Sequence, residues 1–361
     1  MSVIGRPVSP PQPWLRTLRS ALERESAVVR IVLAAVRGSA PREAGVCMLV
    51  SRRGIEGTIG GGRLEWDALA VARILLEDAS GSALLQRVVL GADLGQCCGG
   101  VVELWLERYT SADLGLLETA ERVAWQGEAL LESTLTPDGV QRRVWRGSRL
   151  PDVDAAAPFG VSRLPAGTVS FTEPLNDLRP PVWLFGAGHV GQALARILVD
   201  LPLRLTWIDP RADAFPAPPP AGARILRGAD PLATLTDAPV GTRFIVMTHS
   251  HPLDFELCHA ILGRDDFAWV GLIGSLSKSA RFRSRLRRTG LTAESVARLA
   301  CPIGIGGIDC KWPAAIAVGV AAQLLRELDS ATPHPLRQSV AEAVIDANCS
   351  AGDCASCGVR P

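Results

Sequence analysis

The sequence predicts an α/β protein in which an N-terminal α/β domain is followed by a Rossmann-like domain with a doubly wound parallel sheet. Its 361 residues exceed one ordinary hydrophobic core and suit two domains. The second half alternates short apolar runs with helical segments, as parallel sheets do. The first of those runs enters Gly186-x-Gly188-x-x-Gly191 and leaves into a helical pattern. Strand, glycine turn and helix in this order are typical of a nucleotide-binding unit.

The first half contains strand-like and helical patterns that predict a compact α/β domain over residues 1–150. Apolar positions recur at helical spacing in two stretches, and β-type runs lie around them. Pro137-Asp138-Gly139 joins two such runs, which predicts a β-hairpin. The expected helices are residues 64–77 and 114–125, and the expected strands are 28–36, 46–51, 101–107, 129–135 and 140–145.

The second half predicts the parallel sheet over residues 181–330. Between the halves, proline, alanine, glycine and aspartate replace the periodic pattern, so we expect a linker at 151–180. The proline run 216–220 predicts a loop in place of one crossover helix. A cysteine-rich tail is expected at 331–361. The apolar runs begin near residues 182, 203, 224, 243 and 267, and the helical segments near 190, 254, 276 and 313.

Composition narrows the classes of partner. Lys and Arg number 38 against 37 Asp and Glu, and no basic stripe favours nucleic acid. No apolar run reaches the length of a membrane span, and the proline-rich start lacks the apolar block of a signal peptide. We therefore expect a cytoplasmic protein. Nine cysteines in such a setting suggest reduced thiols, metal ligands or reactive groups before disulfides.

The glycine turn is the first candidate site. Gly186, Gly188 and Gly191 would let the backbone approach a phosphate at a helix N-terminus. His189 sits at a variable position of the turn and faces either the phosphate or solvent. The second strand ends in Asp209, where a carboxylate usually meets a ribose, and Arg211 follows it. These residues predict a Rossmann-type phosphate site and leave dinucleotide binding open.

Two further loops follow strands of the predicted sheet. His249 and His251 alternate after one strand, so along an extended segment both would face one side. They could bind phosphate, transfer protons, hold a metal or serve as ordinary loop residues. Gly274, Ser275 and Lys278 form a second glycine turn that leads into a basic helix start. Together the three loops are expected to surround one anion-binding cleft at the edge of the sheet.

The N-terminal domain carries its own glycine cluster. Gly60, Gly61 and Gly62 stand directly before a helix, and Arg63 and Arg42 could clamp an anion beside their amides. The alternative is a tight turn with surface arginines. Because one glycine suffices for a turn, we favour the anion site.

Two groups of cysteines are candidates for sulfur or metal chemistry. Cys97 and Cys98 are adjacent and framed by glycines, so they could ligate a soft metal or accept transferred sulfur, unless they are simply buried. The tail places Cys349, Cys354 and Cys357 at the spacing of a plant-type iron–sulfur cluster, which needs a fourth cysteine. Zinc at this tail requires fewer assumptions.

Several of these motifs together resemble the xanthine dehydrogenase accessory protein family, XdhC. The resemblance runs in order from about Val28 to Leu325, although the family's usual glutamate is Trp312 here. It covers Gly38-Ser39-Ala40-Pro41-Arg42, the glycine cluster, the paired cysteines, Phe185-Gly-Ala-Gly-His-Val-Gly191, Thr248-His-Ser-His251 and Cys301-Pro-Ile-Gly304.

The resemblance implies a maturation chaperone that binds molybdenum cofactor, a phosphorylated molybdopterin. Such a protein supports cofactor sulfuration with a cysteine desulfurase and delivers it to a molybdenum hydroxylase, a xanthine or aldehyde dehydrogenase. It also implies that the glycines position the cofactor and that Cys97 or Cys98 contacts molybdenum or handles sulfur. The alternative is a NAD-dependent oxidoreductase that uses the glycine turn and Asp209. The apolar helix expected at residues 314–325 could pair across a two-fold axis in a homodimer or simply pack on the sheet.

Overall fold

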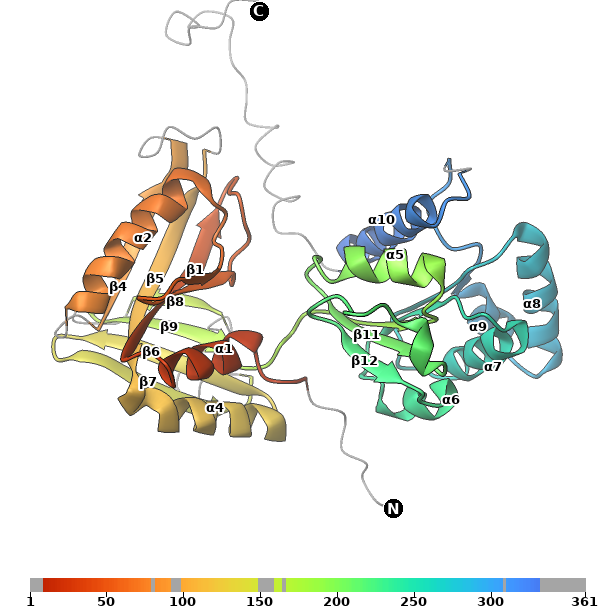
Figure 1. Ribbon diagram of the computed structural model, residues 1–361, viewed down its shortest axis with the longest axis horizontal. Helices are drawn as coiled ribbons and strands as arrows, with labels where there is room; N and C mark the ends of the chain where they lie inside the picture. The colour runs from red at the N-terminus through yellow and green to blue at the C-terminus, as the bar shows by residue number, and fades with distance from the viewer. Residues whose placement is uncertain are drawn as a thin grey trace, which may run out of the picture. The chain divides into compact units, whose positions relative to one another are not determined.

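The computed structural model describes residues 9–78, 82–91, 99–148, 159–163, 167–307 and 310–331, which fall into two compact units. Unit 1 ends at Leu178 and unit 2 begins at Arg179. Figure 1 labels many of the elements of each. The expectation that residues 151–180 form a linker is wrong for much of that range. Two strands of unit 1 lie there, and pairing partners distant in sequence stabilise them.

Unit 1 contains two antiparallel sheets. A five-stranded sheet has the order β3-β2-β1-β5-β4, and a four-stranded sheet has the order β7-β6-β9-β8. Its helices are α1 (Pro13–Leu22), α2 (Gly62–Glu77) and α4 (Leu114–Gln126). Its strands are β1 (Ala27–Arg37), β2 (Cys47–Val50), β3 (Ile55–Gly57), β4 (Ala83–Val89), β5 (Val101–Thr110), β6 (Ala129–Thr136), β7 (Gly139–Arg146), β8 (Gly160–Arg163) and β9 (Val169–Pro174).

Alternation along β1 explains how unit 1 forms its layers. Val29, Ile31 and Leu33 pack beneath α2 on one face of the strand. Val32 on the other face packs against Phe171 of the second sheet. The hairpin expected around Pro137-Asp138-Gly139 is confirmed as β6 and β7, which pair from Ala129 and Arg146 down to the turn.

Unit 2 is built around a six-stranded parallel sheet of order β12-β11-β10-β13-β14-β15, the strand order of a Rossmann fold. Its strands are β10 (Pro181–Phe185), β11 (Arg204–Asp209), β12 (Arg224–Arg227), β13 (Arg243–Val246), β14 (Trp269–Leu272) and β15 (Leu299–Ala300). Its helices are α5 (His189–Leu198), α6 (Pro231–Thr234), α7 (His251–Leu262), α8 (Leu276–Arg288), α9 (Ala293–Ala297) and α10 (Pro313–Ala331).

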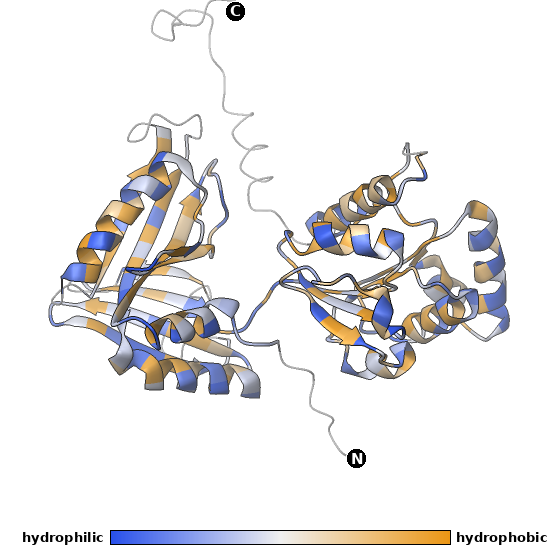
Figure 2. Ribbon diagram, viewed as in Figure 1, coloured by the Kyte–Doolittle hydropathy of each residue, from blue (hydrophilic) through white to orange (hydrophobic). Residues whose placement is uncertain are grey.

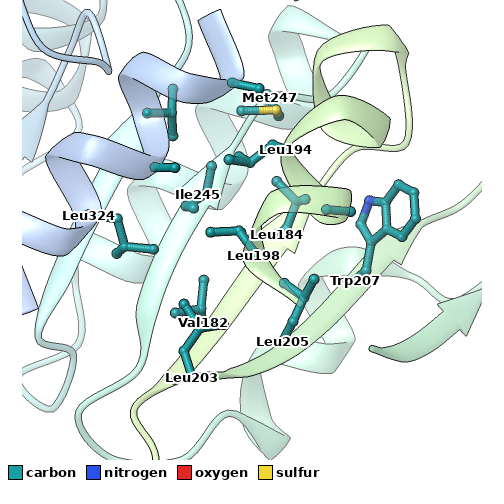
Figure 3. Close-up of a cluster of buried hydrophobic side chains, with 14 of the residues drawn as sticks. Val182, Leu184, Leu194, Leu198, Leu203, Leu205, Trp207, Ile245, Met247 and Leu324 are labelled. Atoms are coloured by element: carbon teal, nitrogen blue, oxygen red, sulfur yellow. The ribbon is translucent and has the colours of Figure 1, made fainter. Parts of the chain in front are cut away.

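Both faces of this sheet are covered, so its strands are apolar on both sides. Val182 and Leu184 of β10 pack with α5 and α10, and Figure 3 shows this cluster. Trp183 and Phe185, between them, pack on the opposite face with α7. The loop predicted at the proline run is confirmed, since β11 and β12 are joined by the short 3-10 turn Ala212–Ala214 and no α-helix.

The order of strands also fixes where a ligand would bind. The chain turns from β10 toward β11 on one side and reaches β13 on the other, so β10 and β13 border the switch point of the sheet. In folds of this kind, ligands bind beyond the carboxyl ends of the strands at that point. The predicted glycine turn, Gly186 to Gly191, lies there.

Candidate functional site

Sterics within the protein require two of the three glycines of the turn but not the third. Gly186 adopts φ +115°, and a Cβ there would lie 2.3 Å from the Met247 carbonyl oxygen. A Cβ on Gly191 would lie 2.1 Å from the Gly186 carbonyl oxygen, so this glycine lets α5 pack closely on the turn. A Cβ on Gly188 would meet no atom within 4 Å. The space beside Gly188 is therefore open to a ligand.

The start of α5 faces this open space. Gly188 is the N-cap residue, and among the described residues no side chain caps the helix. Gly188 and His189 are both exposed. Unpaired amides and the positive end of the helix dipole favour an anion at such a position. The geometry agrees with the phosphate site predicted at Gly186, Gly188 and Gly191, with His189 on its rim.

Asp209 does not have the role predicted for it. Its carboxylate is fully buried at the end of β11 and accepts the Ala187 amide at 2.7 Å. It also accepts the Arg211 amide at 2.9 Å and that guanidinium's Nε and Nη2 at 3.0 and 2.9 Å. Four hydrogen bonds use the acceptor capacity of a carboxylate. Asp209 therefore fastens the glycine turn to β11 and has no free oxygen for a ribose hydroxyl.

The electrostatics of this contact favour the ionised carboxylate. Burial alone would raise the pKa of Asp209, but the hydrogen bonds from Arg211 and Ala187 outweigh it and hold the pKa below the ordinary 3.8. The same contact raises the pKa of Arg211. The Arg211 side chain remains 40% exposed, so a cation stays accessible beside the turn.

The three predicted loops of unit 2 do lie at one edge of the sheet. Met247 donates its amide to Phe185, which brings the loop after β13 beside the glycine turn. Ile273 donates to Val246 in the same way, which brings the loop after β14 beside the loop after β13. The expectation that the turns of β10, β13 and β14 are neighbours is thus confirmed by the register.

A buried ion pair joins two of these loops. Lys278 Nζ donates to Asp254 Oδ2 at 2.8 Å and to the Ile273 carbonyl at 3.0 Å. Asp254 Oδ1 accepts the Thr248 amide at 3.0 Å and its hydroxyl at 2.7 Å. Both side chains of the pair are nearly inaccessible, at 8% and 1%. Lys278, predicted to bind cofactor, therefore positions the loops around the site.

Gly274 and Ser275 serve the same construction. A Cβ on Gly274 would lie 2.8 Å from Lys278 Cδ, so its absence gives the lysine side chain room to reach Asp254. Ser275 caps α8 by accepting the Lys278 amide at 3.2 Å. Both residues therefore help to build the loop, and their cofactor-binding role stays a prediction.

The two histidines are exposed, but they do not form an extended pair. His249 lies in the loop, whereas His251 is the first residue of α7, with Ser250 as its N-cap. His251 Nδ1 lies 3.8 Å from Asp254 Oδ2, and its side chain is 76% exposed. The helix start between the two residues removes the alternation on which the prediction of a shared face depended.

The glycine cluster of unit 1 already holds an anion of its own. Glu65 Oε2 accepts the Thr58 hydroxyl at 2.6 Å and the amides of Ile59 and Gly61, each at 3.1 Å. Gly60 donates its amide to the Thr58 hydroxyl, and Gly60, Gly61 and Gly62 all adopt positive φ. A carboxylate of the same chain therefore occupies the amides of Ile59 and Gly61, which argues against the anion site predicted at Gly60, Gly61 and Gly62.

The Arg63 side chain also has a partner within its own helix. Its Nε lies 3.1 Å from Asp67, one helical turn further along α2. This pair neutralises the charge that was expected to clamp an external anion. Glu65 and Asp67 are the residues that the interpretation of the motif missed. Their spacing after the glycines is the signal, since a carboxylate four residues into a helix can reach back to its free N-terminal amides.

The cysteines predicted to carry sulfur or metal chemistry, Cys97, Cys98, Cys349, Cys354 and Cys357, lie outside the described residues. Among the thiols that are described, burial raises the pKa of Cys258 and, more weakly, that of Cys301. Both thiols are therefore protonated near neutral pH, which suits packing better than nucleophilic chemistry.

Two kinds of feature are absent from the described residues. They contain no group of three or more His, Cys, Asp or Glu side chains arranged to hold a metal ion. No helix in this part of the chain is both long and apolar enough to cross a membrane.

The sequence resembles known proteins in both units. Residues 182–324 match a family described as XdhC Rossmann domain, and residues 21–88 match the XdhC and CoxI family. The uncharacterised protein YqeB of Escherichia coli strain K12 is 27% identical over 166 residues, which are 46% of this chain and 30% of YqeB. The chain thus spans under a third of that relative.

A second relative aligns over most of both chains. This relative, a probable xanthine dehydrogenase subunit of Bacillus subtilis strain 168, is 24% identical over 334 residues, which are 86% of this chain and 96% of that protein. A Bacillus halodurans crystal structure titled as a xanthine dehydrogenase superposes with a TM-score of 0.67. It is 19% identical and covers 88% of this chain and 96% of that one, which shows a shared fold. The two family matches, in order along both units, place this chain in the XdhC and CoxI family.

Proposed function

We propose that this protein binds molybdenum cofactor as a cargo, supports its sulfuration and delivers it to a xanthine or aldehyde dehydrogenase-type molybdenum hydroxylase. The observation that carries the proposal is the open helix start at Gly188. It combines free space at the glycine, an uncapped helix end and a position at the switch point of a Rossmann sheet. Membership of the XdhC and CoxI family supports the identity of the cargo.

The residues present fit the phosphorylated end of such a cargo. The amides at the start of α5 would receive a phosphate, and Gly188 would let it approach the backbone. Arg211 and His189 lie beside the turn, are at least partly exposed and would add positive charge or hydrogen bonds at its rim. The protein's task at this point is binding and orientation, whereas the redox chemistry belongs to the cargo once the client holds it.

The sulfur step is assigned to Cys97 or Cys98. The raised pKa values of Cys258 and Cys301 make these two described thiols poor nucleophiles for this step. Replacing Cys97 and Cys98 by serine, one at a time, should lower the sulfido content of the client enzyme for the functional residue. Unchanged sulfido content in both variants would assign the pair to packing.

The main alternative, a NAD-dependent oxidoreductase, is disfavoured by Asp209. Ribose recognition needs a carboxylate with free acceptor oxygens, and those of Asp209 are occupied by Ala187 and Arg211. We therefore expect a flat titration with NAD. Saturable NAD binding with hydride transfer would restore the alternative.

Cargo binding can be tested by producing the full-length protein in cells that synthesise molybdenum cofactor. The pterin and the metal that co-purify should be measured, by fluorescence of the oxidised pterin and by mass spectrometry. The substitution Gly188→Val should abolish both signals, because its Cβ would stand in the open space proposed for the phosphate, and it should cost about 1 kcal/mol of stability at the N-cap position. Gly115→Val is the matched control, since Gly115 is also exposed and also has no atom within 4 Å of its Cβ position.

Three results would contradict the proposal: wild-type protein without pterin or molybdenum, equal loss in the Gly115 control, or full client activity after the gene is deleted. The first and third address the cargo, and the second addresses the site. If the Gly188→Val variant still carries pterin and molybdenum, the proposed function would stand, but the cargo would bind away from the glycine turn.

A further inference from the structure

Helix α8 concentrates positive charge in a chain that is nearly neutral. Six of its 13 residues are Lys or Arg and none is acidic, whereas the whole chain has a net charge of +1. Four of these cations, Lys278, Arg281, Arg285 and Arg288, follow one another at spacings of three or four residues. Such spacing places them along one side of a helix over about 15 Å. Figure 2 colours much of α8 as hydrophilic.

This side of the helix lines a pocket. The pocket has a volume of about 660 Å³, and we call it the α8 groove. The four cations line it together with His251 and Pro252 of α7, and no acidic side chain is among its lining residues. Volume and length both suit a ligand larger than one phosphate.

The arginines of the groove are unpaired within the described part of the chain. Arg281 and Arg288 are exposed and form no ion pair with a described residue, and the Arg285 guanidinium lies 3.8 Å from the centre of the Phe255 ring. Arg283, which does not line the groove, shows the contrast. It donates to the Ser279 hydroxyl and to the carbonyls of Val296 and Leu299. The fold therefore gives Arg283 hydrogen-bond partners within the protein, whereas Arg281, Arg285 and Arg288 line the groove without such partners among the residues that the structure describes.

Keeping these cations together has a cost in helix stability. Like charges three or four residues apart repel, each pair by a few tenths of a kcal/mol. An external anion would offset this repulsion, which is a reason to expect one.

We propose that the α8 groove is a docking site for an acidic polypeptide segment of a partner protein. Charge complementarity supplies the first argument, because arginine is enriched at protein interfaces and forms bidentate pairs with carboxylates. The second is the mixed floor of the groove. Pro252, Ala280 and Phe282 add apolar surface between the cations, which side chains of a peptide can cover and a bare phosphate cannot.

The same floor weighs against nucleic acid. Two rings line the groove, those of Phe282 and His251, and the Phe282 ring already has two neighbours within the protein. Lys278 Nζ lies 5.1 Å from the centre of the Phe282 ring, and the Phe282 ring meets the Phe255 ring edge to face at 5.8 Å.

The docking proposal concerns a partner polypeptide, so it stands or fails independently of the cargo proposed for the glycine turn.

The test uses the full-length protein and a fluorescent 12-residue peptide of alternating glutamate and serine. Its binding is followed by anisotropy at low and at physiological salt, beside a peptide with glutamine in place of glutamate. The variant R281E/R285E/R288E should bind the acidic peptide at least about tenfold more weakly. The variant R281E/R288E, which keeps the Phe255 contact, should lie between it and the wild type.

A matched control separates a local groove from net charge. R16E/R73E/R122E changes three exposed arginines on helices of unit 1 and alters the net charge equally. We expect this control to bind the acidic peptide as the wild type does. Hydrogen exchange should show protection by the peptide at residues 276–288 in the wild type and the control.

The proposal is overturned if the glutamine peptide binds equally well, or if the groove variants and the control lose binding to the same degree. It is also overturned if inorganic pyrophosphate or a 12-nucleotide thymidine strand displaces the peptide at far lower concentration than unlabelled peptide does. Displacement by pyrophosphate would make the groove a small-anion site, and displacement by the thymidine strand would make it a nucleic-acid site.

Discussion

The carboxylate of Asp254 and the ammonium of Lys278 lie 2.8 Å apart beneath the loops that follow β13 and β14. Together they connect the start of α7 to the start of α8 through Thr248 and the Ile273 carbonyl. This contact holds in place the loops and helix starts that carry the exposed features of this edge, which are His249, His251 and the α8 groove.

The first prediction concerns this ion pair. Asp254→Ala should lower the free energy of unfolding by about 3–5 kcal/mol, because it leaves the Lys278 ammonium buried without its counter-ion. The double variant Asp254→Ala/Lys278→Met should recover part of that loss, since no uncompensated charge remains. Chemical denaturation of both variants measures the difference. A double variant that is much less stable than the single one would contradict this account.

The second prediction separates the glycines of the turn. Gly191→Ala should destabilise unit 2, because its Cβ would lie 2.1 Å from the Gly186 carbonyl oxygen. Gly188→Ala should leave the thermal midpoint within about 1 °C and weaken cargo or phosphate binding, since its Cβ enters free space. Calorimetry and a ligand titration distinguish the two effects. Equal stability of both variants would mean that the turn relaxes readily.

The third prediction is the pH dependence of the glycine cluster in unit 1. The Thr58 hydroxyl, followed by the amides of Gly61 and Ile59, holds the pKa of Glu65 below its ordinary 4.5. A carboxyl whose pKa is lowered by folding stabilises the protein above its unfolded pKa and loses that contribution as pH falls through the folded pKa. Stability should therefore decline as pH drops below about 4.5.

Glu65→Gln is the check on this assignment. It should lower stability near neutral pH by about 1 kcal/mol, because a weaker acceptor replaces the carboxylate. It should also flatten the acid limb of the stability curve, whereas Glu56→Gln, at an exposed strand residue, should not. Thermal midpoints between pH 3 and pH 7 supply the measurement. Parallel curves for wild type and Glu65→Gln would remove the role given to this residue.

The fourth prediction concerns Asp209. Asp209→Ala should lower the free energy of unfolding by about 2 kcal/mol, since it removes hydrogen bonds to Ala187 and to the Arg211 guanidinium. It should not change the NAD titration, because we expect that NAD does not bind the wild type. Arg211→Ala should be milder, because the Arg211 side chain is partly exposed. A carboxylate-dependent NAD titration would show that Asp209 can leave its partners.

The fifth prediction tests a buried contact of unit 1. Arg30 of β1 donates to both oxygens of Glu173 in β9, at 2.5 and 2.6 Å, and stacks on Trp14. Arg30→Met should cost about 3–5 kcal/mol, because Glu173 would remain buried and charged. Arg30→Met/Glu173→Leu should be closer to the wild type. Denaturant midpoints of the two variants decide the matter.

By itself the sequence determined the Rossmann unit, the hairpin of unit 1 and the turn at Gly186 to Gly191. Those features depend on local causes, namely hydrophobic periodicity and the steric demands of glycine over a few residues. The strands at Gly160–Arg163 and Val169–Pro174 were missed because their stability comes from pairing with distant partners in a segment that is locally irregular.

Only the tertiary structure decided which polar groups remain available. Asp209, Lys278 and the amides of Ile59 and Gly61 have the residue types of a ligand site, yet each is satisfied by another group of the same chain. Gly188 and the arginines of the α8 groove remain open. A motif specifies the donors and acceptors, but burial and hydrogen-bond geometry determine which of them still face a ligand.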